Sequence, residues 1–213
     1  MRNRKRVEVT ANTDTDVVTV TDLKRHIRGV PGTADDQIIE DFLDSATEYL
    51  KEYLRIGLKT ETFKLTMDTF GEESEFRKWQ ALGGGVHTGS IVDLRGGWGY
   101  VDLPFAPVQS VTSVTTFDRD DTSSVFPAAN YGLDERSGRL YLNEGEVWPT
   151  NLRDYEAVSI VYVAGYGASS VPEPIKAAIR ELVRLSYDGC AMQMSDGTKA
   201  MLSPYKRLDA LEW

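Results

Sequence analysis

The sequence predicts an α+β protein in which a small helical bundle, made of N- and C-terminal helices, is interrupted by an inserted antiparallel β-domain. Apolar residues repeat at helical spacing near both ends of the chain, in residues 38–54 and 175–183. From about residue 61 to residue 164, apolar and polar residues alternate, and Gly, Asp and Pro mark turns. Because an apolar helix face must be covered, the helices before and after the β region are expected to pack on each other.

These patterns divide the chain into three predicted parts. Residues 1–18 are expected to form a flexible N-terminal arm, because the segment MRNRKRVEVTANTDTD is basic and polar and has no apolar stretch after it. Residues 19–60 and 168–213 form the predicted helical bundle, and residues 61–167 form the predicted inserted β-domain. At 213 residues the chain is long enough for one large domain or two small ones with a substantial core.

Two helices are predicted in the first helical segment. The stretch TDLKRHIRG begins with Thr21 or Asp22 as a plausible N-cap and stops at Gly29. The stretch ADDQIIEDFLDSATEYLKEYLRIG is strongly amphipathic, has acidic residues in its first turn, where the helix dipole favours them, and ends at Gly57. Its apolar stripe consists of Ile38, Ile39, Phe42, Leu43, Ala46, Tyr49, Leu50, Tyr53 and Leu54.

The β region contains strand patterns in ETFKLTM, VQSVTSVTTF, GRLYL and AVSIVYVA. In the first of these, Phe63, Leu65 and Met67 fall on one face. The glycine-dense segment Gly71–Gly99 is predicted to be a long loop or hairpin. After the last strand, the stretch GYGASSVP is predicted to be the turn at which the chain leaves the β-domain and returns to the bundle.

The last segment is helical again. In PEPIKAAIRELVRLSYDG, one apolar stripe runs from Ile175 to Val183, and Pro174 stands in the first turn, where its missing N–H is tolerated. A loop, MQMSDGTKAML, and then a short helix, SPYKRLDALEW, are predicted to follow.

Composition excludes several classes of protein. No apolar run is long enough to cross a bilayer, and no secretory signal is present. Cys190 is the one cysteine, so neither an intrachain disulfide nor a cysteine metal cluster can form, which suits a reducing cytoplasm. The net charge of −9 argues against free binding to duplex DNA, because neutralisation of phosphates drives that affinity.

No pattern of catalytic, cofactor-binding or metal-binding residues is recognisable. His26 and His87 have no partner at metal-ligand spacing, and GGGVHTG lacks the Gly-Lys-Ser/Thr of a P-loop. Ser90 and Ser169 lack the surroundings of a hydrolase nucleophile. The acidic stretch Asp118–Ser124 lacks the glycine and glutamate of an EF-hand, so a solvated hairpin turn is expected. We therefore expect neither catalysis nor a cofactor.

Aromatic residues in the β region leave one alternative open. A platform for stacking on sugars could be assembled from the set Trp98, Tyr100, Tyr131, Tyr141 and Trp148. Aromatic residues in strands more often lie in the core or in cross-strand pairs. A carbohydrate- or receptor-binding β-module of a phage tail-associated protein is the alternative function, although such a module needs no helical frame.

The order of these features resembles the head–tail connector proteins of tailed bacteriophages, also called adaptor or head-completion proteins, in their long form with a β insertion. The matching stretches are TVTDLKRHIRG, DDQIIEDFLDSATEYLKEYL, VDLPFAPVQSVTSVTTFD, YGLDERSGRLYLNEGEVWP, AVSIVYVAGYGASSVPEPIKAAIRELV and MLSPYKR. Together they cover most of Val18–Arg207, whereas the segment Gly71–Gly99 and the residues after Arg207 have no match.

The resemblance implies a structural virion protein at the head–tail junction, made in the host cytoplasm during assembly. Its partners would be the portal protein, a neck or tail-completion protein, and copies of itself in a ring. That ring is expected to be twelvefold in the particle, and the chain can be a monomer by itself. DNA would pass through the ring without specific binding, and neither a membrane nor a cofactor is involved.

Two sets of residues are expected to carry this role. The face of the long helix opposite its apolar stripe carries Asp41, Asp44, Glu48 and Glu52, with Lys51 beside them. These carboxylates line the DNA channel if the ring turns them inward, and otherwise form an ordinary solvated face. The candidate portal contact is the C-terminal set Leu202, Tyr205, Lys206, Arg207, Leu208, Leu211 and Trp213, which could instead pack on its own bundle.

Overall fold

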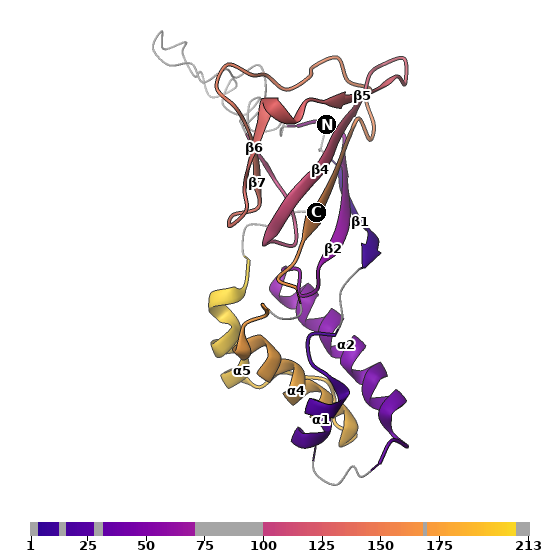
Figure 1. Cartoon of the computed structure of the whole chain (residues 1–213), viewed down its shortest axis with the longest axis vertical. Coiled ribbons are helices and arrows are strands. Elements are labelled where there is room, and N and C mark those ends of the chain that lie inside the picture. Colours follow the sequence, from indigo (N-terminus) through magenta and orange to yellow (C-terminus); the bar gives the residue numbers. More distant parts are fainter. Residues whose placement is uncertain (1–3, 13–15, 28–31, 71–99, 168–169, 208–213) are drawn as a thin grey trace. The chain divides into compact units, whose positions relative to one another are not determined.

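The computed structural model describes residues 4–12, 16–27, 32–70, 100–167 and 170–207, and it divides them into two compact domains (Figure 1). The helical domain contains the described residues between 12 and 61 and between 165 and 207. The β-domain contains the described residues between 4 and 11 and between 62 and 164. The predicted α+β class, with a β-domain inserted between helices, is confirmed.

The helical domain is built from α1 (Val20–His26), α2 (Asp36–Leu54), α4 (Glu173–Tyr187), α5 (Asp196–Leu202) and the 3₁₀ turn η2 (Ser203–Tyr205). Helices α2 and α4 lie side by side, and α1 packs against both (Figure 1). Their fully buried side chains form one core, to which each helix contributes its apolar stripe; it includes Leu23, Ile39, Leu43, Leu50, Leu54, Ile175, Ile179, Leu182 and Leu202. Within the predicted stripe of α2, Ile38 and Tyr49 are exposed.

The helix boundaries follow local capping rather than the predicted stop signals. Helix α1 begins after Thr19, whose hydroxyl accepts a hydrogen bond from the Asp22 N–H, instead of at Thr21 or Asp22. Helix α2 ends at Leu54 and is capped by Arg55, which adopts a left-handed conformation (φ 58°) and donates its N–H to the Lys51 carbonyl.

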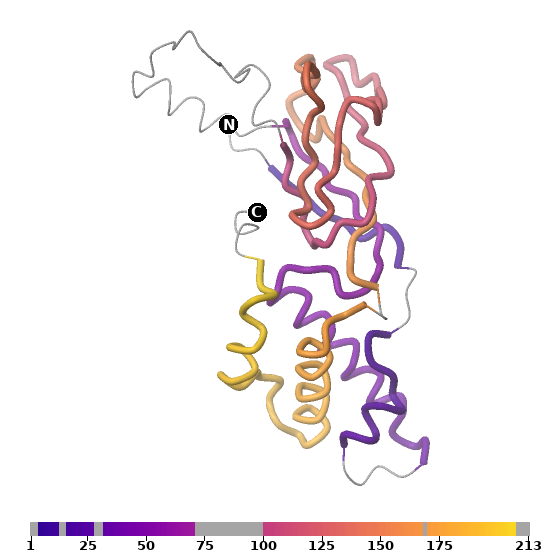
Figure 2. The backbone as a smooth tube through the Cα atoms, turned by 60° about the vertical axis from the view of Figure 1, so that its left-hand side comes forward, coloured from indigo at the N-terminus to yellow at the C-terminus, as the bar shows by residue number. Residues whose placement is uncertain are grey.

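The C-terminal part differs from its prediction. The stretch expected to be a loop contains α5, because Ser195 accepts a hydrogen bond from the Thr198 N–H and caps the helix. Thr198 Oγ1 also donates to the Glu181 carboxylate of α4, and α5 lies against α4 (Figure 2). Of the helix expected from Ser203 onward, the described residues form only the 3₁₀ turn η2.

The β-domain contains two sheets. The five-stranded sheet has the order β1-β2-β8-β4-β5, and the three-stranded sheet has the order β3-β7-β6. The strands are β1 (Lys5–Asn12), β2 (Glu61–Met67), β3 (Tyr100–Asp102), β4 (Val108–Phe117), β5 (Ser123–Phe126), β6 (Tyr131–Asp134), β7 (Arg139–Leu142) and β8 (Val158–Ala164), with a 3₁₀ turn η1 (Ala128–Asn130) before β6. Strand β4 is antiparallel to both β5 and β8, and β7 is antiparallel to β3 and β6.

One core lies between these strands. Phe63, Leu65 and Met67 of β2 are buried on one face, as their alternation predicts. The Phe63 ring stacks on Tyr162 of β8, with ring centroids 5.6 Å apart. The Tyr162 hydroxyl donates a hydrogen bond to the Pro104 carbonyl, so this buried polar group is satisfied.

The N-terminal segment also differs from its prediction. Residues 5–12, expected to belong to a flexible arm, form strand β1 at one edge of the five-stranded sheet. The Thr10 hydroxyl donates to the Thr62 carbonyl of β2, and Val7 packs against the β core. Two valines in a charged segment are too weak a pattern to predict a strand, and the exposed edge of β2 supplies the partner.

The first residues of the helical domain after β8 make close backbone contacts within that domain. The Tyr166 N–H donates to the Gly57 carbonyl over 3.1 Å. Gly165 has φ +119°, and a Cβ atom there would lie 1.9 Å from the Lys59 carbonyl oxygen. This glycine is therefore required by both conformation and space. Within the described residues, no helix is long and apolar enough to cross a membrane.

Candidate functional site

The outer face of α2 presents the acidic residues that the sequence singled out. Asp41, Asp44, Glu48 and Glu52 are all exposed, on the side of the helix away from the apolar core. The Asp44 side chain is 74% exposed and the Glu48 side chain 65% exposed. The Asp41 carboxylate accepts a hydrogen bond from the Gln37 side chain, one turn earlier. We refer to these four residues as the acidic face.

Two lysines flank the acidic face, and each is bound more closely to another carboxylate. Lys51 Nζ lies 2.7 Å from Glu61 Oε2 and 3.7 Å from Glu48 Oε2. Lys59 Nζ lies 2.7 Å from Asp16 Oδ1 and 3.9 Å from Asp44 Oδ1. Because the nearer partners already compensate these lysines, the acidic face keeps its net negative charge.

The pair Lys51–Glu61 is buried, and sequence reasoning did not find it. The two side chains are only 8% and 9% exposed. The sequence places Lys51 beside the acidic residues of α2, and Glu61 at the start of a strand, with no signal that the two meet. The pair joins the last turn of α2 to Glu61, the first residue of β2.

The C-terminal candidates divide into three groups. Leu202 is fully buried in the helical core, so it offers no surface to a partner in this conformation. Tyr205 packs partly against the same core, and Lys206 Nζ lies 4.4 Å from the centre of the Tyr53 ring. The Arg207 N–H donates to the Leu54 carbonyl over 3.0 Å. The remaining candidates lie outside the described residues: Leu208, Leu211 and Trp213.

Two tyrosines of the helical domain have a raised pKa. Burial raises the pKa of Tyr166, and the neighbouring Tyr205 adds to this effect. The Tyr187 hydroxyl donates to the Asp35 carboxylate over 2.8 Å, and this hydrogen bond raises the pKa of Tyr187. Both tyrosines therefore remain neutral at physiological pH, and both pack partly against the helical core.

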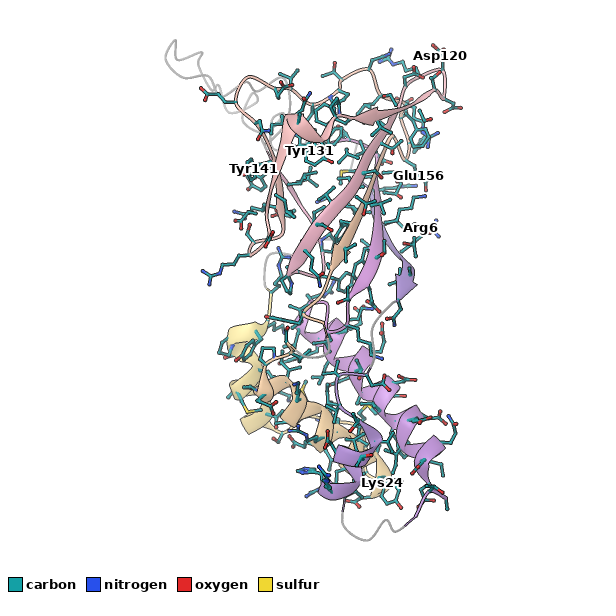
Figure 3. The ribbon with its side chains drawn as sticks, viewed as in Figure 1. Arg6, Lys24, Asp120, Tyr131, Tyr141 and Glu156 are labelled. Carbon is teal, nitrogen blue, oxygen red and sulfur yellow. The ribbon has the colours of Figure 1, made fainter. Side chains whose placement is uncertain are left out.

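The structure does not assemble the proposed aromatic platform. Trp148 is buried in the β core and stacks on Phe70, with ring centroids 4.2 Å apart. Tyr131 stacks on Phe126, whereas Tyr141 is 43% exposed (Figure 3). Arg139 covers the Tyr100 ring. Trp98 lies outside the described residues. The described members of the set therefore do not form a shared stacking surface, since the one described tryptophan, Trp148, is buried.

The other candidates for chemistry have structural roles or stand alone. The Asp118 carboxylate accepts hydrogen bonds from the Asp120 and Thr122 N–H groups, each over 2.9 Å, and so shapes the turn between β4 and β5. His26 is exposed at the end of α1, and His87 lies outside the described residues. Among the described residues, no group of three or more His, Cys, Asp or Glu side chains could hold a metal ion.

Neither a protein-family model nor a curated protein matches this sequence. Solved structures do match. A chain in the neck of an empty gene transfer agent (GTA) particle, computed with C6 symmetry, aligns with a TM-score of 0.70 and 20% identity, over 95% of this chain and 96% of that one. A chain in the virion of a native GTA particle aligns with a TM-score of 0.67 and 19% identity, over 95% of each chain.

A third similar chain comes from the neck of a native GTA particle computed with C12 symmetry. It aligns with a TM-score of 0.56 and 21% identity, over 85% of this chain and 93% of that one. Identities near one fifth show a shared fold. This chain therefore has the fold of these neck and virion chains over most of its length.

Proposed function

We propose that this chain is a structural protein of the neck of a tailed-phage-like particle, where its copies form the head–tail connector ring below the portal. The observation that supports this most is the fold shared with a GTA neck chain over 95% of the present chain. In this role the protein extends the DNA channel and offers a docking surface to the next neck or tail protein. The role requires no catalysis.

The acidic face suits the wall of a DNA channel. Its four carboxylates are exposed, and the flanking lysines are compensated by Glu61 and Asp16. Repeated around a ring, this face forms a negative band opposite the DNA phosphates. A basic wall would gain affinity for DNA by releasing counterions, whereas a negative wall lets the genome slide.

The end of the chain suits a contact with the portal. Lys206 contacts the Tyr53 ring and Arg207 donates to the Leu54 carbonyl, both at the end of α2, and six residues follow Arg207 in the sequence. Three of those six residues are large and apolar: Leu208, Leu211 and Trp213. Apolar and aromatic side chains of this kind supply most of the affinity at protein interfaces.

The decisive experiment measures binding of the full chain to the portal protein of its own particle, and images the complex by electron microscopy. A ring of this chain on the portal is expected. Replacing Leu208, Leu211 and Trp213 with serine should weaken binding about tenfold or more, since each is an apolar anchor. The unfolding temperature should stay unchanged because the variant keeps Lys206 and Arg207, whose contacts with Tyr53 and Leu54 hold the chain to α2.

A matched control removes the charges of the same six residues through Asp209→Ala and Glu212→Ala. It should bind the portal nearly as well as the full chain. If the full chain does not associate with the portal at any ratio, the proposed function is wrong. If the serine variant binds as well as the full chain, only the assignment of the C-terminal contact is wrong.

A further inference from the structure

The five-stranded sheet ends in two edge strands, β1 and β5, both within the β-domain. In the described part of the sheet, no strand follows either edge. An edge strand presents backbone N–H and C=O groups that can pair with another chain. Each edge also carries an exposed β-branched residue, with Val9 49% and Val125 68% exposed. The two edges are thus both suited to strand pairing.

Both edge strands run in the same direction. The Arg4 N–H donates to Asp68 and the Thr10 hydroxyl donates to the Thr62 carbonyl, so β1 is antiparallel to β2. The Glu156 N–H, just before β8, also donates to Asp68, just after β2, so β2 is antiparallel to β8. The registers make β8 and β4 antiparallel, and β4 and β5 antiparallel. Strands β1, β8 and β5 therefore point the same way.

The starts of β1 and β5 also lie at the same end of the sheet. The Asp68 carboxylate accepts hydrogen bonds from the N–H of Arg4, next to β1, and from the N–H of Glu156, which precedes Ala157. The Phe117 N–H donates to the Ala157 carbonyl over 2.8 Å, and Phe117 is paired with Ser123, the first residue of β5. A continuous row of contacts thus crosses the sheet from the start of one edge strand to the start of the other.

The charges at these two starts are opposite. The start of β1 carries Arg4, Lys5, Arg6 and Glu8. The turn before β5 carries Asp118, Arg119, Asp120 and Asp121. Arg6 lies on β1, where it pairs with Glu8 over 2.7 Å and leaves Arg4 and Lys5 as the other cations, and Asp120 lies in the turn before β5 (Figure 3). Arg153 contacts Asp121, which leaves Asp120 as the carboxylate at the tip of the turn. The basic start of one edge therefore complements the acidic start of the other.

We propose that this sheet continues from one copy of the chain to the next, with β1 of one copy pairing in parallel with β5 of its neighbour. Such a contact uses different surfaces on the two copies, and repeating it generates a closed ring when the rotation per step closes. The opposite charges set the register, with the starts of the two strands together. The inference rests on the proposed function in one respect, since that function is the reason to expect a closed ring.

Disulfide cross-linking of the full-length chain tests this pairing. Neighbouring strands lie about 4.8 Å apart, within the Cα separation that a disulfide spans. Ser124 lies on the core face of β5, because it contacts Thr116, which is buried. Val7 packs on the core, so Lys5 and Val9 share its face of β1. The test combines Ser124→Cys with Lys5→Cys or Val9→Cys after Cys190→Ser removes the native thiol.

On oxidation of the concentrated protein, at least one of these double variants should give a ladder of dimers, trimers and longer multimers. Each single variant, and a control that combines Ser124→Cys with Val147→Cys in an exposed loop, should give no ladder. The proposal is overturned if no double variant forms multimers beyond those of the single variants. If the protein forms a ladder but fails to bind the portal, the strand contact stands and the neck function is wrong. If it binds the portal but forms no ladder, the neck function stands and the strand contact is wrong.

Discussion

Replacing Lys51 with methionine should destabilise the helical domain strongly, although Lys51 is a charged residue on the charged side of a surface helix. Its side chain is 8% exposed and lies 2.7 Å from the Glu61 carboxylate, which is 9% exposed. Methionine has a similar length and helix propensity, so the change removes mainly the charge. Glu61 then keeps a buried carboxylate without its ammonium partner.

The expected loss is about 3–5 kcal/mol of unfolding free energy, the usual effect of removing one partner of a buried ion pair. A protein domain has a total stability of roughly 5–15 kcal/mol, so the variant should be close to unfolding. The double variant Lys51→Met with Glu61→Leu should return to within about 1 kcal/mol of the original chain, because no unpaired charge remains buried. Recovery in the double variant would show that the unpaired Glu61 charge causes the loss, because lost packing around residue 51 would persist in the double variant.

A matched control uses the same lysine and its exposed partner. Glu48 lies 3.7 Å from Lys51 but is 65% exposed, so Glu48→Gln should change the stability by about 1 kcal/mol or less. Urea unfolding followed by the helical circular dichroism signal measures all three variants. A loss below about 1 kcal/mol for Lys51→Met, or no recovery in the double variant, would refute the reasoning.

Two further changes have clear expected outcomes. Asp41→Lys, Asp44→Lys and Glu48→Lys together should leave folding and ring assembly intact, since exposed charges contribute about 0–1 kcal/mol each. Genome retention or ejection from assembled particles should change, most strongly at low salt, and unchanged ejection at every salt concentration would make this an ordinary solvated face. Gly165→Ala should cost about 3 kcal/mol or more, because its Cβ would meet the Lys59 carbonyl. Gly189→Ala, also at positive φ but with open space, should cost about 1–2 kcal/mol, and the urea-unfolding assay described above measures both glycine variants.

The sequence alone was enough to determine the elements whose pattern is long and regular. Helix α2 occupies Asp36–Leu54 within the predicted amphipathic stretch, and β4 occupies Val108–Phe117 as its alternation predicts. The exposure of the acidic face follows in the same way, because residues opposite an apolar stripe face the solvent. These features depend on the geometry of one helix or strand, which repeats every 3.6 or 2 residues and is therefore written in neighbouring residues.

Only the tertiary structure decided the features that depend on distant partners. Strand β1 contains two valines and forms because β2 offers it an edge. Leu202 looked available to a partner, yet it is buried in the core that α2 and α4 share. Lys51 and Glu61 each look like ordinary charged residues until the chain brings them within 2.7 Å. The spacing of apolar residues along one segment does not predict such contacts, because they depend on how separate segments pack around a common core.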